Sequence, residues 1–180
     1  VLEHSFAEDG AIVAAQYYKR TNRVSIGICD TGIGIWRSMW DNWRPKNDLE
    51  ALKLALTPGI TGTTKREGGT SENAGAGLFF IKSIAKISRN YFVIYSGPAE
   101  YTLLKYKKRI KGMPRLYGDP TRDRHNETNT SAKFQGTLVA VDISLDETPE
   151  FNDLLTSIGE VYHQAIRERK KERYRRPKFI

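Results

Sequence analysis

The 180-residue chain is poor in the residues that form covalent or metal cross-links. Its single cysteine, Cys29, excludes an internal disulfide and is typical of a reducing compartment. Its histidines, His4, His125 and His163, are too widely separated for a metal-ligand motif. No apolar run reaches the roughly 18 residues that a membrane span needs, and no signal peptide is visible at Val1. We therefore expect a cytoplasmic protein outside the membrane, whose given sequence starts inside a longer protein or has been trimmed.

The net charge of +8 is concentrated at the C-terminal end. Residues 167–180 hold eight Lys or Arg against two Glu, whereas the rest of the chain holds 21 against 19. Such a segment fits a solvated helix end, where positive charge complements the helix dipole, or a contact with nucleic acid or an acidic partner. We expect one domain over residues 1–148, followed by a C-terminal helix with a basic tail over 149–180.

Alternating and helical patterns divide the chain into short elements. Helices are predicted at 48–56, at 77–88 and from Thr148-Pro149 onward, and strands at 11–18, 24–29, 91–95, 101–106 and 137–145. The first two strands form a predicted hairpin, and the next two form another about Ser96-Gly97-Pro98. Residues 57–74 are predicted to be a mobile loop, and 107–134 an excursion from the sheet. The fold class is therefore α+β, a two-layer α/β sandwich with a mixed, mostly antiparallel sheet covered on one face by helices.

The first chemical motif is Asp30-Thr31-Gly32-Ile33-Gly34-Ile35, which ends an apolar strand. An ionised carboxylate such as that of Asp30 only accepts hydrogen bonds, so it can receive the exocyclic amino group of adenine, which guanine lacks at that place. Gly32 and Gly34 permit close backbone approach. The alternative is an ordinary tight turn after a strand, because Asp-x-Gly is common turn chemistry.

The second motif is Gly75-Ala76-Gly77-Leu78, which opens a predicted helix. A helix N-terminus offers unpaired N–H donors and a positive dipole end, and both suit phosphate. A dinucleotide fingerprint is excluded because Phe80 replaces the third glycine, and the 59–65 stretch lacks the P-loop spacing. In the same loop, Thr64 and Lys65 are candidates for contact with a terminal phosphate, although a solvated loop lysine is the simpler interpretation.

With Gly136-Thr137 before the last long strand, these motifs resemble the Bergerat-fold (GHKL) ATP-binding superfamily. This superfamily includes DNA gyrase, the ninety-kilodalton heat-shock chaperone, histidine kinases and mismatch-repair ATPases. The resemblance covers roughly residues 1–145, and the run from Gly77 to Lys86 is most similar to the histidine-kinase branch.

The resemblance implies a role for each motif. Asp30 would bind the adenine amino group, and Gly32 and Thr137 would support adenine directly or through water. Beneath a lid over 57–74, the implied set of nucleotide-binding residues is Asp30, Gly32, Gly34, Ile35, Thr64, Lys65, Gly75, Ala76, Gly77, Leu78 and Thr137.

Mg²⁺ is implied as the second cofactor beside ATP, since it offsets phosphate charge. Val1–Ser5, with Glu3 and His4, resembles the tail of the family's N-box, whose metal-binding asparagine would precede Val1.

We therefore expect an ATP-binding domain of a kinase-like or ATPase protein in signalling or regulation, with an adenine nucleotide and a protein partner or upstream domain as its partners. Catalytic residues are not assigned. The alternative is a non-catalytic, nucleotide-gated interaction module that contacts nucleic acid or an acidic partner. It would use the basic tail and the 105–115 cluster, with base stacking on Tyr101, Tyr106, Tyr117 and Tyr174.

Overall fold

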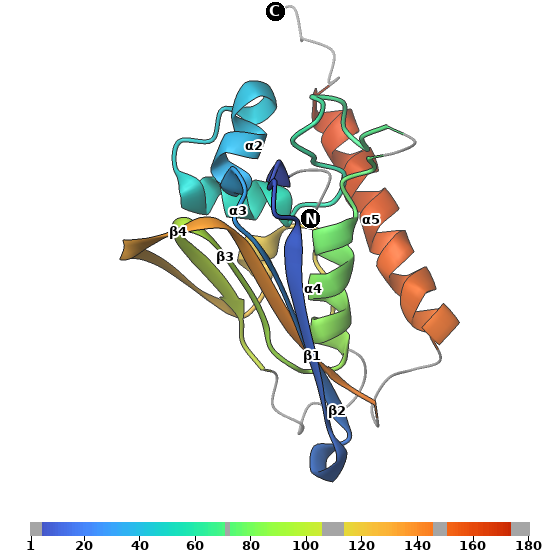
Figure 1. The fold of residues 1–180 in the computed structure, drawn as a ribbon. Coiled ribbons are helices and arrows are strands. Elements are labelled where there is room, and N and C mark those ends of the chain that lie inside the picture. The colour runs from blue at the N-terminus through green and yellow to red at the C-terminus, as the bar shows by residue number, and fades with distance from the viewer. Residues whose placement is uncertain (1–4, 71–72, 106–113, 146–150, 174–180) are drawn as a thin grey trace, which may run out of the picture.

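The computed structural model describes residues 5–70, 73–105, 114–145 and 151–173, with Ser131 and Phe151 described in their backbone only. Four strands form the sheet, namely β1 (Ala11–Tyr18), β2 (Arg23–Asp30), β3 (Phe92–Leu103) and β4 (His125–Ser144). The α-helices of the described ranges are α2 (Gly34–Trp43), α3 (Asp48–Ala55), α4 (Gly77–Ile87) and α5 (Phe151–Arg173). Two short 3₁₀ turns, η1 (Lys19–Thr21) and η2 (Pro120–Arg122), complete the elements (Figure 1).

The sheet has the order β1-β2-β4-β3, and every neighbouring pair is antiparallel. The central strand β4 brings distant sequence segments together. Its Thr137 lies opposite Asp30 of β2 on one side and opposite Ser96 of β3 on the other. The sheet register therefore sets the end of the Asp30 motif beside the Gly136-Thr137 pair.

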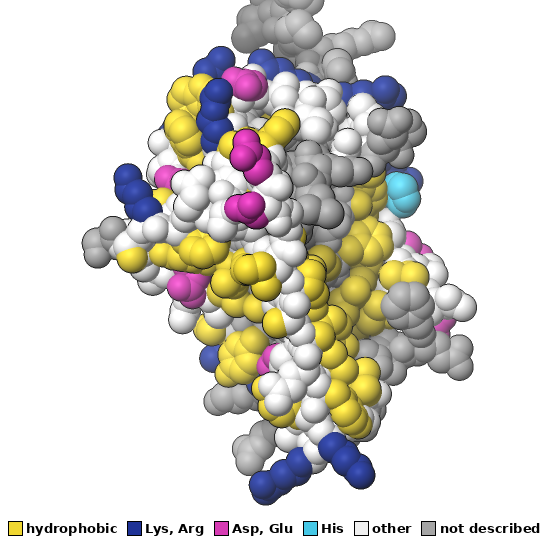
Figure 2. All heavy atoms as spheres, viewed as in Figure 1, with side chains coloured by type: hydrophobic (Ala, Val, Ile, Leu, Met, Phe, Trp, Pro, Cys, Tyr) yellow, Lys and Arg dark blue, Asp and Glu magenta, His cyan; other side chains and the backbone are white. Residues whose placement is uncertain are grey.

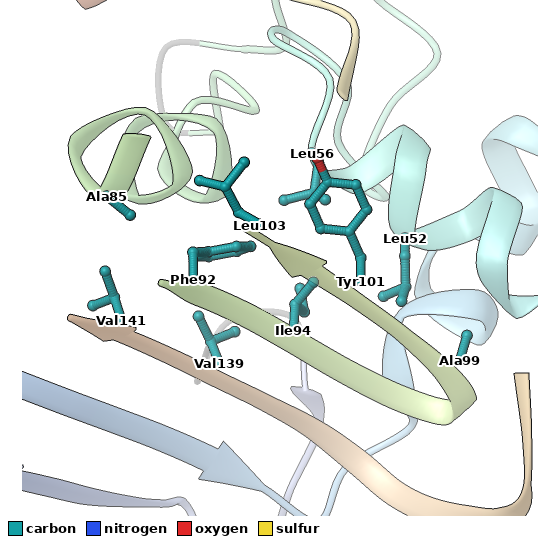
Figure 3. Packing of buried hydrophobic residues seen from close by; sticks show 10 residues of the cluster. All are labelled: Leu52, Leu56, Ala85, Phe92, Ile94, Ala99, Tyr101, Leu103, Val139 and Val141. Carbon is teal, nitrogen blue, oxygen red and sulfur yellow. The ribbon is translucent and has the colours of Figure 1, made fainter. Parts of the chain in front are cut away.

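Helices cover one face of this sheet, which confirms the two-layer α/β sandwich. The main core lies between that face and helices α3 and α4, where Phe92, Ile94 and Tyr101 of β3 are fully buried (Figure 3). Helix α5 packs against α4 through a second cluster that includes Phe79 and Ile158. None of the helices in the described ranges combines the length and the apolar sequence that crossing a bilayer demands.

Strand β1 is an edge strand that is accessible on both faces. Its hydrophobic side chains Ile12, Val13, Tyr17 and Tyr18 are exposed, and Figure 2 shows hydrophobic surface along this strand. Helices α2, α3 and α4 contact mainly β3 and β4. The well-packed half of the sandwich is therefore the half formed by β3, β4 and the helices that cover them.

The predicted second hairpin was wrong. Residues 92–103 form the single strand β3, which pairs along its length with β4. Its register shifts between Ser96 and Gly97 and between Gly97 and Ala99, and Gly97 adopts a φ of 59°. A bulge at Gly97-Pro98 accommodates a proline without a ladder hydrogen bond, so turn-like residues bend the strand instead of ending it. The excursion predicted over residues 107–134 was also too long, because residues 125–134 already belong to β4.

Helix α2 was not predicted, because its segment is rich in tryptophan and polar residues. Its apolar stripe is nevertheless helical, since Ile35, Met39 and Trp43 recur at intervals of four residues and pack in one cluster. The indole N–H of Trp43 donates to the carbonyl oxygen of Thr61 at 2.7 Å, and the amide of Asn42 donates to Gly62 O at 2.6 Å. Helix α2 therefore fixes the start of the loop over residues 57–74, which we call the Gly/Thr-rich loop.

A buried charged triad fastens α4 to the segment before β4. The ammonium groups of Lys82 and Lys86 each donate to one carboxylate oxygen of Asp123, and all three side chains are at most 1% exposed. Burial lowers the pKa of Lys86 below its ordinary value of 10.5, and Asp123 offsets part of that effect. The Lys86 ammonium also lies 4.2 Å from the ring centroid of Tyr117.

The lowered pKa of Lys86 predicts a pH dependence of stability. As the pH rises through the folded-state pKa toward 10.5, the unfolded chain binds more protons at this residue than the folded chain does. The free energy of unfolding of the natural chain should therefore rise over that window relative to Lys86→Met, which lacks the titrating group. Urea unfolding of both chains across an alkaline pH series measures this difference, and a constant difference would contradict the prediction.

Candidate functional site

A cavity of about 480 Å³ lies where the end of β2, the starts of α2 and α4, and parts of the Gly/Thr-rich loop meet. This volume is within the range of small-molecule sites, roughly 300–1,000 Å³. Both predicted motifs contribute to its wall. Its lining consists of Ser5, Asp30, Gly34, Ile35, Ser38, Met39, Ala55, Ile60, Thr61, Gly62, Asn73, Ala74, Gly75, Ala76, Gly77, Leu78, Ile81, Thr137 and Val139.

Asp30 is the acidic group of this cavity. It is the last residue of β2, and only 4% of its surface is exposed. Its Oδ1 accepts the backbone N–H of Gly32 at 2.9 Å, which fixes the orientation of the carboxylate. No described residue donates a hydrogen bond to Oδ2, so that oxygen is available as an acceptor for a bound donor.

Backbone contacts hold the Asp30 wall together. Gly136 has a φ of 99°, and a Cβ there would lie 2.0 Å from the carbonyl oxygen of Asp30, so position 136 requires glycine. The Ser96 hydroxyl donates to Gly136 O at 2.8 Å and accepts the N–H of Ile35 at 2.9 Å. One serine thus links β3, β4 and the start of α2 around the cavity.

The opposite wall is the N-terminus of α4. The N-cap residue Ala76 provides no side-chain cap, so the first N–H groups of the helix lack that partner. Gly75 turns the chain with a φ of 64°, and a Cβ at this position would lie 2.5 Å from Ile60 O. A Cβ at Gly77 would meet no atom within 4 Å, so the backbone there adjoins open space. This wall offers uncapped N–H donors and the positive end of a helix dipole.

Eight of the eleven predicted nucleotide-binding residues line the cavity. They are Asp30, Gly34, Ile35, Gly75, Ala76, Gly77, Leu78 and Thr137. Gly32 lies behind the wall, where a Cβ would collide with Ser5 O. Thr64 pairs with Thr61 in an isolated bridge, Lys65 is exposed, and neither lines the cavity. Glu3 and His4 lie outside the described residues.

The sequence prediction missed most of the apolar part of the lining. Met39 comes from α2, Ala55 from α3, Ile81 from α4 and Val139 from β4. The helical spacing of Met39 was a usable signal, whereas the others were recognisable only as core residues. Together with Ile35 and Leu78, these side chains give the cavity an apolar surface suited to the faces of a flat ring.

The charge distribution of the cavity is simple. Among the described lining residues, Asp30 is the only one with an ionisable side chain. The described ranges contain no group of three or more His, Cys, Asp or Glu arranged to hold a metal ion.

The nucleic-acid alternative loses one of its predicted contacts. Tyr101 is fully buried, where it stacks on His125 with ring centroids 4.7 Å apart, so it is inaccessible to a base. Arg122 and Lys86 lie against the ring of Tyr117. Tyr106, Tyr174 and most of the 105–115 cluster lie outside the described residues.

No protein-family model matches the chain, and no curated protein is significantly similar to it.

Proposed function

We propose that the chain is an ATP-binding domain of a kinase-like or ATPase protein that acts in signalling or regulation in the cytoplasm. One observation carries this proposal. A single cavity joins a buried carboxylate, Asp30, to the uncapped N-terminus of α4, and its intervening wall is apolar. Adenine nucleotides combine the same three features, namely a donor group, an apolar ring and a phosphate chain.

Adenine recognition follows from the acceptor chemistry of Asp30. Its Oδ1 already accepts the N–H of Gly32, so Oδ2 would receive the exocyclic amino group of the base. Guanine presents a carbonyl oxygen at that position, and two acceptors facing each other in a buried site are repulsive. The base would lie between apolar side chains such as Met39 and Val139.

Phosphate binding would use backbone groups rather than lysine. The uncapped N–H groups at the start of α4 would donate to phosphate oxygens in the open space beside Gly77, and the helix dipole would favour an anion there. Mg²⁺ would enter bound to the triphosphate and water, because this ion keeps much of its water shell and binds substrate phosphates.

The test is the substitution Gly77→Ala. Its methyl group would enter the open space beside the α4 N-terminus and keep the phosphates from the N–H donors, so we expect ATP affinity to fall about tenfold or more. Stability should be maintained, because Gly77 does not have a positive φ and an added Cβ would meet no atom within 4 Å. Titration calorimetry with ATP and Mg²⁺ measures the affinity, and thermal unfolding measures the stability.

Gly159→Ala is the matched control. Gly159 is also a helical glycine, in α5, at which a Cβ would meet no atom within 4 Å, and it lies outside the cavity lining. This variant should bind ATP as the natural chain does. Equal affinity in the Gly77→Ala variant and the natural chain would refute phosphate binding at α4.

A further inference from the structure

Helix α5 contacts the cavity wall through a buried tyrosine. The hydroxyl of Tyr162 donates to the carbonyl oxygen of Ala74 at 2.6 Å, and Ala74 is a lining residue directly before Gly75. The ring lies against Phe79 and Phe80 at the start of α4, with centroids 6.4 and 6.1 Å away. Burial raises the pKa of Tyr162, and the weaker effect of Arg169 opposes it, so the hydroxyl keeps its proton at neutral pH.

Two helical turns after Tyr162, a charged contact joins α5 to the earlier part of the Gly/Thr-rich loop. The Arg169 guanidinium donates to the carbonyl oxygen of Pro58, and its Nε lies 3.5 Å from the Glu67 carboxylate. Arg173 approaches the same carboxylate at 3.6 Å. The Glu67 side chain is only 11% exposed and that of Arg169 is 25% exposed, so this pair is partly shielded from water.

An apolar contact lies between these two anchors. Ile166 packs against the loop backbone, where a Cβ on Gly59 would lie 2.7 Å from its Cδ1 and a Cβ on Gly68 3.8 Å. The loop is linked onward, because Gly68 N–H donates to Gly59 O and Gly59 N–H donates to Gly75 O, both at 2.9 Å. The contacts of α5 therefore continue through backbone hydrogen bonds to Gly75, in the cavity wall at the N-terminus of α4.

The four α5 residues form one stripe of the helix. Tyr162, Ile166, Arg169 and Arg173 follow a spacing of four, three and four residues, which places them on one face. All four contact the loop over residues 58–75, with its described parts 58–70 and 73–75. One rigid helix thus contacts both ends of this loop.

We infer that α5 regulates the proposed nucleotide site, with Tyr162 and Arg169 as positioning residues that hold the loop in its nucleotide-binding conformation. This inference rests on the proposed function. Because such coupling is reciprocal, bound nucleotide stabilises the docking of α5 by the same factor by which docked α5 strengthens nucleotide binding. Anything that displaces α5 from the loop would release the nucleotide.

The experiment compares two tyrosine variants of the full chain. Tyr162→Phe removes the hydroxyl that bonds Ala74 and keeps the ring between Phe79 and Phe80. Tyr101→Phe is the control, since its buried hydroxyl donates to Pro120 O at 2.9 Å, away from the cavity lining. From the net contribution of one hydrogen bond, we expect ATP affinity to fall about threefold to tenfold in Tyr162→Phe and to stay unchanged in Tyr101→Phe. Glu67→Gln, which removes the charge opposite Arg169, should also lower affinity.

Amide hydrogen exchange supplies the readout that a purely structural role would not change. Saturating ATP with Mg²⁺ should slow exchange in residues 151–173 of the natural chain, and less so in Tyr162→Phe. If the natural chain binds no ATP, the proposed function fails. If it binds ATP, but Tyr162→Phe and Glu67→Gln keep full affinity and ATP does not change the amide exchange of α5, the coupling is overturned and the proposed function stands.

Discussion

Replacing Asp30 by Asn is expected to weaken ATP binding by roughly 30- to 150-fold, which corresponds to about 2–3 kcal/mol. The carboxylate has two acceptor oxygens, one for the N–H of Gly32 and one for the base. An asparagine has one oxygen and one NH₂ group, so one of these two donors would face another donor. In a cavity where the side chain is 4% exposed, water cannot compensate for that mismatch.

A two-ligand comparison separates recognition from general damage. In calorimetric titrations the natural chain should prefer ATP to ITP, in which an oxygen replaces the amino group, and the Asp30→Asn variant should lose most of that preference. Asp41→Asn, at an exposed carboxylate of α2, is the control and should leave both affinities unchanged. An Asp30→Asn variant that folds and still prefers ATP as the natural chain does would exclude Asp30 from adenine recognition.

The second large effect concerns stability. Asp123→Asn should lower the free energy of unfolding by about 3–5 kcal/mol, because it leaves two buried ammonium groups beside a neutral amide. Lys82 and Lys86 are both 1% exposed, and Asp123 provides the carboxylate that both of them contact. The loss would loosen the segment before β4 from α4.

Lys86→Met is the matched comparison for this triad. It leaves one lysine with one carboxylate and keeps an aliphatic side chain of similar length, so it should cost less than half as much as Asp123→Asn. Urea unfolding followed by circular dichroism measures both variants, provided that the slope of each transition is unchanged. Equal losses in the two variants would show that burial of charge does not govern this contact.

Much of the fold was predictable because local patterns agree with tertiary structure. Strand β1 occupies the predicted residues, and α4 begins at the predicted Gly77. One error arose where residues typical of turns lie inside a continuous strand. Gly97-Pro98 bulges β3 instead of ending it, since the ladder with β4 resumes on both sides. Helix α2 was missed because tryptophans obscure the spacing of Ile35 and Met39.

The site was predictable only in part. Its two glycine motifs carry local signals, because Gly75 and Gly136 need a positive φ and close backbone approach. The rest of the lining depends on which apolar side chains the sheet and helices bring together, and a sequence pattern marks these only as core. The contact between Tyr162 and Ala74 joins residues 88 positions apart, so no local pattern indicates it.

The most direct test of the account is a crystal structure of the full chain with a non-hydrolysable ATP analogue and Mg²⁺. The account predicts the adenine amino group within hydrogen-bond distance of the Asp30 carboxylate, with phosphate oxygens at the N–H groups that begin α4 near Gly77. A nucleotide bound elsewhere on the chain, with the cavity between Asp30 and α4 empty, would contradict it.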